Sequence, residues 1–385
     1  MLRMNNRRLG VLTLFCVLLL AFTSFAYATD YEVFVGTYNG PQSKGIYSFH
    51  FDPTTGKFTQ PELAAATENA SFLALDPHDH FLYAVNELEK YQGSASGAVS
   101  VFAIDPANAK LTFKQQIASL GADPAHLSLD HTGHYLLVAN YTSGNVAVFP
   151  IEKDGLLGSH TALDQHSGSS VNPDRQKGPH AHEIVLTADN RLAMSPDLGL
   201  DKIIIDRFDT AQGTLRANDP PFATVAPGAG PRHIVFSHDG KFAYVIDEMA
   251  CDVTVFSVSS TGAMTILQTI PTIPNHASSD TGAEIELNPA GRFLYTSTRG
   301  TNVITQFAVD HATGKLTLVD RTSSGGVAPR FFALDPSGRW MFVANQQSNV
   351  IVLFSVDKES GKLTKTSQME VGSPVCLVFV PASGS

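Results

Sequence analysis

The sequence predicts an all-β fold: a seven-bladed β-propeller of four-stranded antiparallel blades, with the ring closed by the C-terminal strand joining the N-terminal strands. Three observations support this prediction. A turn phrase recurs seven times, a two-strand phrase recurs six times, and the missing half-copy is divided between the chain ends. The composition agrees, because only 16% of the 385 residues are charged and the chain holds 30 Gly and 21 Pro, as in a turn-rich β protein.

The turn phrase has the form Asp310-His-Ala-Thr-Gly-Lys-Leu-Thr317. Clear copies begin at Asp52, Asp105, Asp310 and Asp357, and weaker copies at Glu152, Asp209 and Ser259. The spacings are 53, 47, 57, 50, 51 and 47 residues, close to one four-stranded blade each. Asp and Gly favour tight turns because Asp hydrogen-bonds its own backbone and Gly accepts positive φ. We therefore expect each copy to join the third and fourth strands of one blade.

The second phrase is an apolar strand, a tight turn and another apolar strand, as in residues 332–345. It recurs at residues 73–86, 127–140, 184–197, 234–247 and 285–297. The seventh copy is divided, because Pro374–Val380 has no successor strand and Tyr31–Val35 has no predecessor. Asp335 and Gly338 of this phrase are interpreted as turn formers. A pair of β-sandwich domains is the alternative fold, but it does not predict the divided unit.

The N-terminus predicts export. Arg3, Arg7 and Arg8 precede an apolar run that ends in Ala26-Tyr-Ala28, the pattern of a signal peptide cleaved before Thr29. A retained membrane anchor is the alternative, but the run is short for a span. We expect residues 1–28 to be the signal, residues 29–385 to be one propeller domain, and the protein to be periplasmic or secreted, with no membrane association after cleavage.

Charge and cysteine content narrow the partners. The net charge of −10 becomes −13 once the three signal arginines are removed, and no basic face is visible, so nucleic acid is not an expected partner. Cys251 and Cys376 lie in apolar runs that we interpret as strands, where we expect two buried thiols and no disulfide framework. The sequence does not predict an oligomeric state.

Propeller geometry locates a candidate site. The segments that lead into each inner strand, and those that leave each second strand, meet near the axis on the face opposite the turns described above. The leading segments are His180-Ala-His182-Glu183, Pro231-Arg232-His233, Gly282-Ala283-Glu284 and Pro329-Arg330. The leaving segments are Asn86-Glu87, Asn140-Tyr141, Asp247-Glu248, Arg299 and Asn345-Gln346. The longest unit contributes the polar loop Ser159–Lys177, which is either a lid over the site or a mobile surface loop with no part in it.

Several phrases carry a family resemblance: Val33–Tyr38, Gly178–His182, Gly230–His233, Asp247–Met249 and Val343–Gln346. With them, the chain from Tyr31 to Pro381 resembles the lactonase family of seven-bladed propellers, which includes propeller-type 6-phosphogluconolactonases and carboxymuconate-lactonising enzymes. The resemblance implies an enzyme that hydrolyses a sugar lactone ester, as in conversion of 6-phosphogluconolactone to 6-phosphogluconate. It also implies a small-molecule lactone partner and no cofactor.

The resemblance makes His182, Arg232, Glu248 and Arg299 the expected catalytic set. His182 or Glu248 would act as base, and the planar fork of Arg232 suits an oxyanion or carboxylate. The expected substrate-binding residues are His180, His233, Glu284 and Arg330. Each of these residues also has a structural interpretation, because a His can satisfy backbone carbonyls and a Glu–Arg pair can simply neutralise buried charge.

Metal binding is the alternative chemistry, with His180 and His182 on one strand face and an added Glu oxygen. The nearby arginines would repel a cation, so we predict no metal site. Three functions remain open. A metal-independent lactonase releases acid, an isomerase of the lactonising type changes muconate absorbance without acid release, and a noncatalytic exported binding propeller turns over no lactone.

Overall fold

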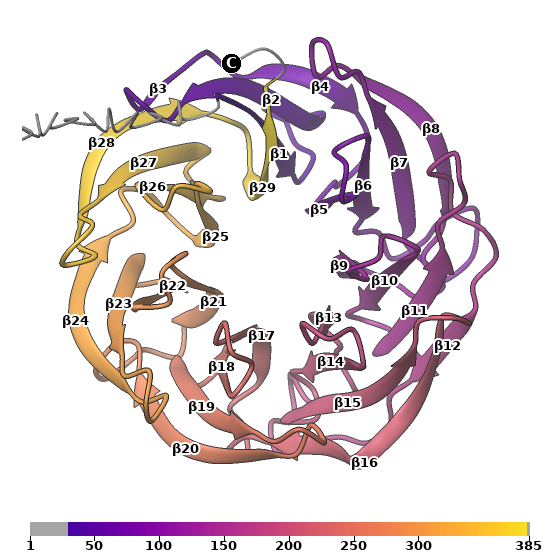
Figure 1. Ribbon diagram of the computed structural model, residues 1–385, viewed down its shortest axis with the longest axis vertical. Helices are drawn as coiled ribbons and strands as arrows, with labels where there is room; N and C mark the ends of the chain where they lie inside the picture. Colours follow the sequence, from indigo (N-terminus) through magenta and orange to yellow (C-terminus); the bar gives the residue numbers. More distant parts are fainter. Residues whose placement is uncertain (1–29, 383–385) are drawn as a thin grey trace, which may run out of the picture.

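The computed structural model describes residues 30–382, in which 29 strands form seven antiparallel sheets arranged around one axis (Figure 1). This confirms the predicted seven-bladed propeller. The predicted signal, residues 1–28, lies outside the described residues. Across residues 30–382, no helix has the length and apolar character needed to cross a bilayer.

The blades follow the chain around the ring, each running from an inner strand to the rim. The first blade contains β29 (Pro374–Pro381), β1 (Tyr31–Thr37), β2 (Gly45–Asp52), β3 (Lys57–Phe58) and β4 (Glu62–Ala66). The second contains β5 (Phe72–Leu75), β6 (Phe81–Asn86), β7 (Ala98–Ile104) and β8 (Leu111–Ala118). The third contains β9 (Pro124–Leu129), β10 (Tyr135–Asn140), β11 (Asn145–Pro150) and β12 (Ala162–Gln165), and the fourth contains β13 (Val185–Leu186), β14 (Leu192–Asp197), β15 (Lys202–Asp209) and β16 (Thr214–Thr224). The fifth blade contains β17 (Pro231–Phe236), β18 (Phe242–Asp247), β19 (Asp252–Val258) and β20 (Met264–Pro271). The sixth contains β21 (Thr281–Leu287), β22 (Phe293–Arg299), β23 (Val303–Val309) and β24 (Leu316–Ser323). The seventh contains β25 (Pro329–Leu334), β26 (Trp340–Asn345), β27 (Val350–Val356) and β28 (Leu363–Glu370).

The ring closes in the first blade, where the two ends of the chain share one sheet. Strand β1 pairs antiparallel with β29, from Tyr31 opposite Pro381 to Gly36 opposite Cys376. Figure 1 shows the two strands side by side next to the axis. The divided unit expected from the repeats is therefore confirmed, and the backbone edges that an open ring would expose are paired.

The core is divided among the contacts between blades. Seven hydrophobic clusters are present in the described part of the chain, and each combines strands from two adjacent blades. At the closing contact, Phe51 of the first blade meets Phe342 of the last at 4.8 Å between ring centroids in an edge-to-face arrangement. Each blade is thus packed against a neighbour on both sides, which fixes the position of the segments at its axial end.

The turn phrase recurs because its glycine packs against the neighbouring blade. Gly56 has φ of 72°, and a Cβ there would overlap the indole of Trp340 in the preceding blade. Gly314 has φ of 70° and lies in the same way against Phe242. Most copies therefore carry glycine, which accepts positive φ and adds no side chain, whereas the copy at Asp105 has Ala109 at this position with φ of 54°.

The turn and cysteine predictions had mixed outcomes. Asp335 Oδ1 accepts hydrogen bonds from the backbone N–H of Arg339 at 2.9 Å and of Trp340 at 2.8 Å, as expected of a turn former. Both cysteines are buried and free, and Cys376 lies in β29. The expected strand at Cys251 was wrong, because this residue occupies the turn between β18 and β19 with φ of 51°. Its apolar neighbours belong to the strand that starts one residue later.

Candidate active site

A cavity of about 350 Å³ lies where second strands end and inner strands begin. Its lining residues are Tyr38, Glu87, Ala125, Tyr141, Arg175, His182, Glu248, Thr281, Arg299 and Arg330. They come from every part of the ring, since Tyr38 follows β1 and Glu248 follows β18. We call this cavity the axial mouth.

Glu248 is the centre of charge in the axial mouth. Its Oε1 lies 2.8 Å from Arg175 Nη2, and its Oε2 lies 3.0 Å from Arg299 Nη2 and 3.3 Å from Arg232 Nε. Glu248 and Arg232 are buried, and Arg299 is mostly so. One carboxylate thus holds three guanidinium groups from three different parts of the chain, which fixes their orientation.

The arginines determine the protonation of this carboxylate. Burial opposes ionisation of Glu248, but the charges of Arg299, Arg232 and Arg175 outweigh it and lower its pKa to about 2. For Arg232, burial and the like charges of Arg330 and Arg299 disfavour the charged form and lower the pKa to about 9. Glu248 is therefore ionised and fully engaged at neutral pH, which makes it a poor proton acceptor.

Positive charge exceeds negative charge at the axial mouth. The fourth guanidinium, that of Arg330, lies over the ring of Tyr38 at 5.4 Å from the centroid, and the Tyr38 hydroxyl donates a 2.7 Å hydrogen bond to Glu87. The lining of the mouth thus has three guanidinium groups, those of Arg175, Arg299 and Arg330, against two carboxylates, Glu87 and Glu248. This excess favours an anionic ligand or an oxyanion that forms during a reaction.

His182 is the basic side chain of the axial mouth that carries no fixed charge. It is 4% exposed, its ring meets Tyr141 at 5.5 Å and His233 at 5.1 Å, and its Nδ1 has no hydrogen-bond partner among the described residues. Burial, followed by the charge of Arg232, lowers its pKa well below 6.5. His182 is therefore a neutral imidazole at neutral pH, and its buried Nδ1 keeps unused hydrogen-bonding capacity in the wall of the mouth.

Below the axial mouth lies a buried layer of imidazoles and carboxylic acids. A 3.0 Å hydrogen bond joins His233 Nδ1 to Glu284 Oε1, and His126 Nε2 lies 3.7 Å from Glu183 Oε1. Burial raises the pKa of Glu284 to about 7, against the effect of Arg232. This layer closes the mouth from beneath and packs the ring of His233 against His182.

The segment from Ser159 to Lys177 is fastened to the propeller and delivers Arg175. Asp201 accepts hydrogen bonds from Ser170 Oγ at 2.5 Å and from Gln176 Nε2 at 2.8 Å. Arg175 then donates from Nη2 to Glu248 Oε1 and, at 3.1 Å, to the Tyr141 hydroxyl. The segment thus contributes a side chain to the mouth, which favours the interpretation as a lid over that of a mobile surface loop.

His166 fastens the same segment through charge. Its Nδ1 lies 2.7 Å from Asp197 Oδ2 and its Nε2 3.4 Å from Asp164 Oδ2, with the side chain 1% exposed. Burial alone would lower the pKa of His166, but hydrogen bonds to Asp164 and Asp197 and their charges raise it to about 9.

The raised pKa predicts a loss of stability at alkaline pH. A folded-state pKa above the ordinary 6.5 gives stabilisation that is complete below pH 6.5 and is lost as the pH rises through about 9. We expect His166→Asn to remove roughly 3 kcal/mol of unfolding free energy below pH 6.5 and much less above pH 9. Urea unfolding of both proteins across this range checks it, and parallel curves would contradict it.

The structure separates the predicted site residues into three groups. His182, Glu248, Arg299 and Arg330 line the axial mouth. Arg232, His233 and Glu284 lie buried directly behind it. His180 does not line the mouth: its ring stacks on Tyr141 at 4.6 Å, and its Nδ1 lies 3.0 Å from the Tyr141 carbonyl oxygen. Its position therefore supports Tyr141 and does not favour the expected contact with substrate.

Several residues of the site had no role predicted from the sequence: Tyr38, Glu87, His126, Tyr141, Arg175 and Glu183. A signal for His126 existed, because Pro124-Ala-His126 opens β9 as Pro231-Arg-His233 opens β17. Aligning the inner strands would have found it. Arg175 has no repeat counterpart, so no periodic signal marks it.

Residues 32–379 match the family described as lactonase, seven-bladed β-propeller. The chain belongs to the lactonase family. The 6-phosphogluconolactonase of Bacillus subtilis is 35% identical over 306 residues, 79% of this chain and 85% of that protein. The 6-phosphogluconolactonase of Formosa agariphila is 32% identical over 308 residues, 78% of this chain and 86% of that protein.

Solved structures of lactonase propellers agree. The periplasmic gluconolactonase of Pseudomonas aeruginosa superimposes with a TM-score of 0.87 at 37% identity, covering 92% of this chain and all of that one (100%). The resemblance inferred from the sequence phrases is thereby confirmed. For metals, no group of three or more His, Cys, Asp and Glu side chains within residues 30–382 is arranged to hold an ion.

Proposed function

We propose that the protein is an exported, metal-independent lactonase that hydrolyses a sugar lactone ester at the axial mouth. The observation that carries the proposal is the juxtaposition of the neutral imidazole of His182 with guanidinium groups held in place by Glu248. Membership of the lactonase family supports it, as do relatives named 6-phosphogluconolactonase and periplasmic gluconolactonase.

The chemistry needs a base for water and a partner for the oxyanion. His182 accepts a proton from water as the oxygen attacks the lactone carbonyl carbon. Arg299, which lines the mouth, and the charge of Arg232 directly behind it stabilise the negative charge on the carbonyl oxygen. The ring C–O bond then breaks, and the protonated imidazole returns its proton to the leaving ring oxygen. The surrounding arginines favour this return, because they destabilise a charged imidazole. The product is the hydroxy acid.

Glu248 acts here as the group that positions the arginines. Its two oxygens are occupied by Arg175, Arg232 and Arg299, and its pKa of about 2 leaves it without affinity for a proton at neutral pH. Of the two bases that the sequence left open, the geometry therefore favours His182. Arg330, on the opposite side of the mouth beside Tyr38, is placed to hold the substrate.

A lactone panel tests the function. We expect acid release from glucono-1,5-lactone or its 6-phosphate at neutral pH, unchanged by a chelator, with the acidic limb of the pH profile below 6.5 because the pKa of His182 is depressed. The rate is read by pH-stat titration. A muconate absorbance change without acid release would instead select the isomerase, and no turnover of any lactone would refute the enzyme. Cell fractionation tests the export.

A further inference from the structure

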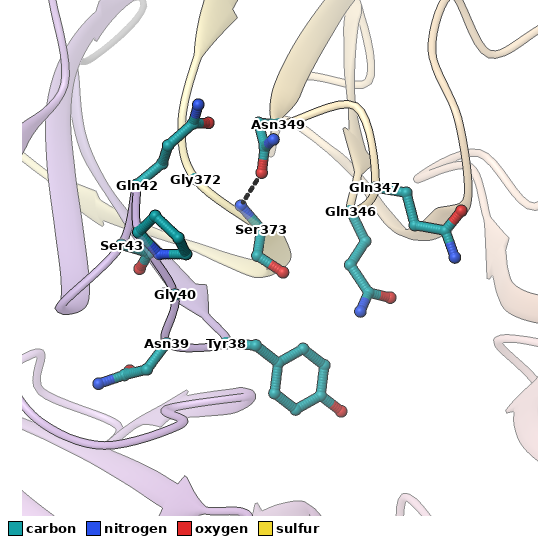
Figure 2. Close-up of a pocket in the computed structure, with 11 residues that line it drawn as sticks. Tyr38, Asn39, Gly40, Gln42, Ser43, Gln346, Gln347, Asn349, Gly372 and Ser373 are labelled. Carbon is teal, nitrogen blue, oxygen red and sulfur yellow. Dashed lines mark hydrogen bonds between the residues drawn. The ribbon is translucent and has the colours of Figure 1, made fainter.

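A second cavity, of about 420 Å³, adjoins the axial mouth at the ring closure (Figure 2). Tyr38 lines both cavities. The remaining walls come from the loop after β1, the loop after β26, and the loop between β28 and β29. We call this cavity the amide pocket, because five of its lining residues carry side-chain amides: Asn39, Gln42, Gln346, Gln347 and Asn349.

The amide pocket and the axial mouth have different chemistry. None of the described residues that line the amide pocket is Asp, Glu, Lys, Arg or His, whereas the mouth is lined by three arginines and two glutamates. An uncharged pocket offers no attraction to a phosphate or carboxylate, which the guanidinium groups of the mouth would bind instead. Its ligand is therefore neutral and polar.

The free hydrogen-bonding groups of the amide pocket point to a polyhydroxylated ligand. The side-chain amides of Gln42, Gln346 and Gln347 make no hydrogen bond to any other residue in 30–382. Each such amide offers two N–H donors and a carbonyl acceptor, the combination that pairs with sugar hydroxyls. In Figure 2, Gln42 lies on one side of the pocket, and Gln346 and Gln347 lie on the other.

The backbone around these amides is fixed before any ligand binds. Asn349 Oδ1 accepts a 2.8 Å hydrogen bond from the Ser373 N–H, and the Tyr38 N–H donates to the Ser373 carbonyl at 3.1 Å. The turn that carries Gln42 is closed by reciprocal bonds between Gly40 and Ser43 of 3.1 and 3.2 Å. A pocket whose walls are ordered in advance loses little entropy on binding.

We propose that the amide pocket is a glycosyl subsite, so that the preferred substrate is a lactone carrying an O-linked neutral sugar. This inference rests on the proposed function: the lactone ring occupies the axial mouth, and the attached sugar extends past Tyr38 into the amide pocket. Tyr38 is the shared wall, held by its hydrogen bond to Glu87 and its contact with Arg330.

The test compares glucono-1,5-lactone with 4-O-glucosyl-glucono-1,5-lactone on the full chain. We expect kcat/KM to be about tenfold higher for the disaccharide lactone, as two added neutral hydrogen bonds would give. The double variant Gln42→Ala/Gln346→Ala should lose that tenfold advantage while its kcat/KM for glucono-1,5-lactone stays unchanged. Gln212→Ala, an exposed glutamine in the turn after β15, is the matched control and should change neither.

Two outcomes separate the subsite from the lactonase activity. If glucono-1,5-lactone is hydrolysed but the disaccharide lactone is no better, or if the double variant lowers both equally, the subsite is refuted and the lactonase stands. Calorimetric binding of the stable product, 4-O-glucosyl-gluconate, does not depend on turnover. The double variant should weaken this binding about tenfold relative to gluconate, and equal binding would refute the subsite even if no lactone were hydrolysed.

Discussion

Arg232→Ala is expected to lower kcat/KM for lactone hydrolysis on the order of 10²–10³-fold, the usual cost of losing a group that stabilises the oxyanion. Arg232 is 2% exposed, and its Nε lies 3.3 Å from Glu248 Oε2 while Nη1 donates to the Ala283 carbonyl. These contacts fix the guanidinium without help from substrate. A group held in advance loses no reorganisation energy when charge develops on the carbonyl oxygen, so its removal should act on kcat more than on KM.

Two further variants distinguish this role from a role in folding. Arg232→Lys keeps a positive charge but loses the planar fork, so we expect it to recover only part of the activity. Arg191→Ala removes an exposed arginine that pairs with Asp189, 2.6 Å away, and should leave kcat/KM unchanged. Thermal melts show which variants fold. A folded Arg232→Ala protein with full activity would show that Arg232 only balances the charge of Glu248.

The fold was predictable because its signals are local and repeated. In six of the seven turn copies the chain needs a glycine at positive φ beside a large side chain of the neighbouring blade, as at Gly56 and Trp340. That requirement recurs along the chain, so the repeat can be counted from the sequence. The closing pair of β1 and β29 followed from the count, since one strand at each end lacked a partner. Cys251 was misplaced because an apolar run does not show which residue carries the turn.

The site was predictable only as far as the repeat register extends. The register placed Glu248, Arg299 and Arg330 at the axial end of the blades, where they line one cavity. The register could not show which charged side chains contact one another, because the three partners of Glu248 are spread over more than 100 residues of sequence, from Arg175 to Arg299. Distances of 2.8 to 3.3 Å depend on side-chain packing that no sequence spacing encodes.

The protonation states of the site residues could not be predicted from the sequence. The sequence allowed either His182 or Glu248 as base, since both residue types serve in that role. The choice depends on burial and on neighbouring charges, which lower the pKa of both side chains for different reasons. For the imidazole a low pKa gives the free base at neutral pH. For the carboxylate, the same direction of shift removes its affinity for protons.

Glu248→Gln is expected to lower the unfolding free energy at neutral pH by about 3 kcal/mol, because it leaves buried guanidinium groups without their counter-charge. Glutamine has the same shape, so the loss reports charge and not packing. It should also tighten binding of an anionic product such as gluconate, since one negative charge leaves a mouth already rich in arginines. The exposed Glu359→Gln is the matched control and should change neither quantity.

The acid limb of stability gives an independent test of the same carboxylate. Its folded-state pKa of about 2 lies below the ordinary 4.5, so its stabilisation is present above pH 4.5 and is lost as the pH falls through about 2. The shift corresponds to roughly 3 kcal/mol, the same size as the cost of the substitution at neutral pH. The unfolding free energies of the wild type and Glu248→Gln should therefore converge as the pH falls toward 2. Urea unfolding curves that stay parallel would show that the arginines do not depend on this charge.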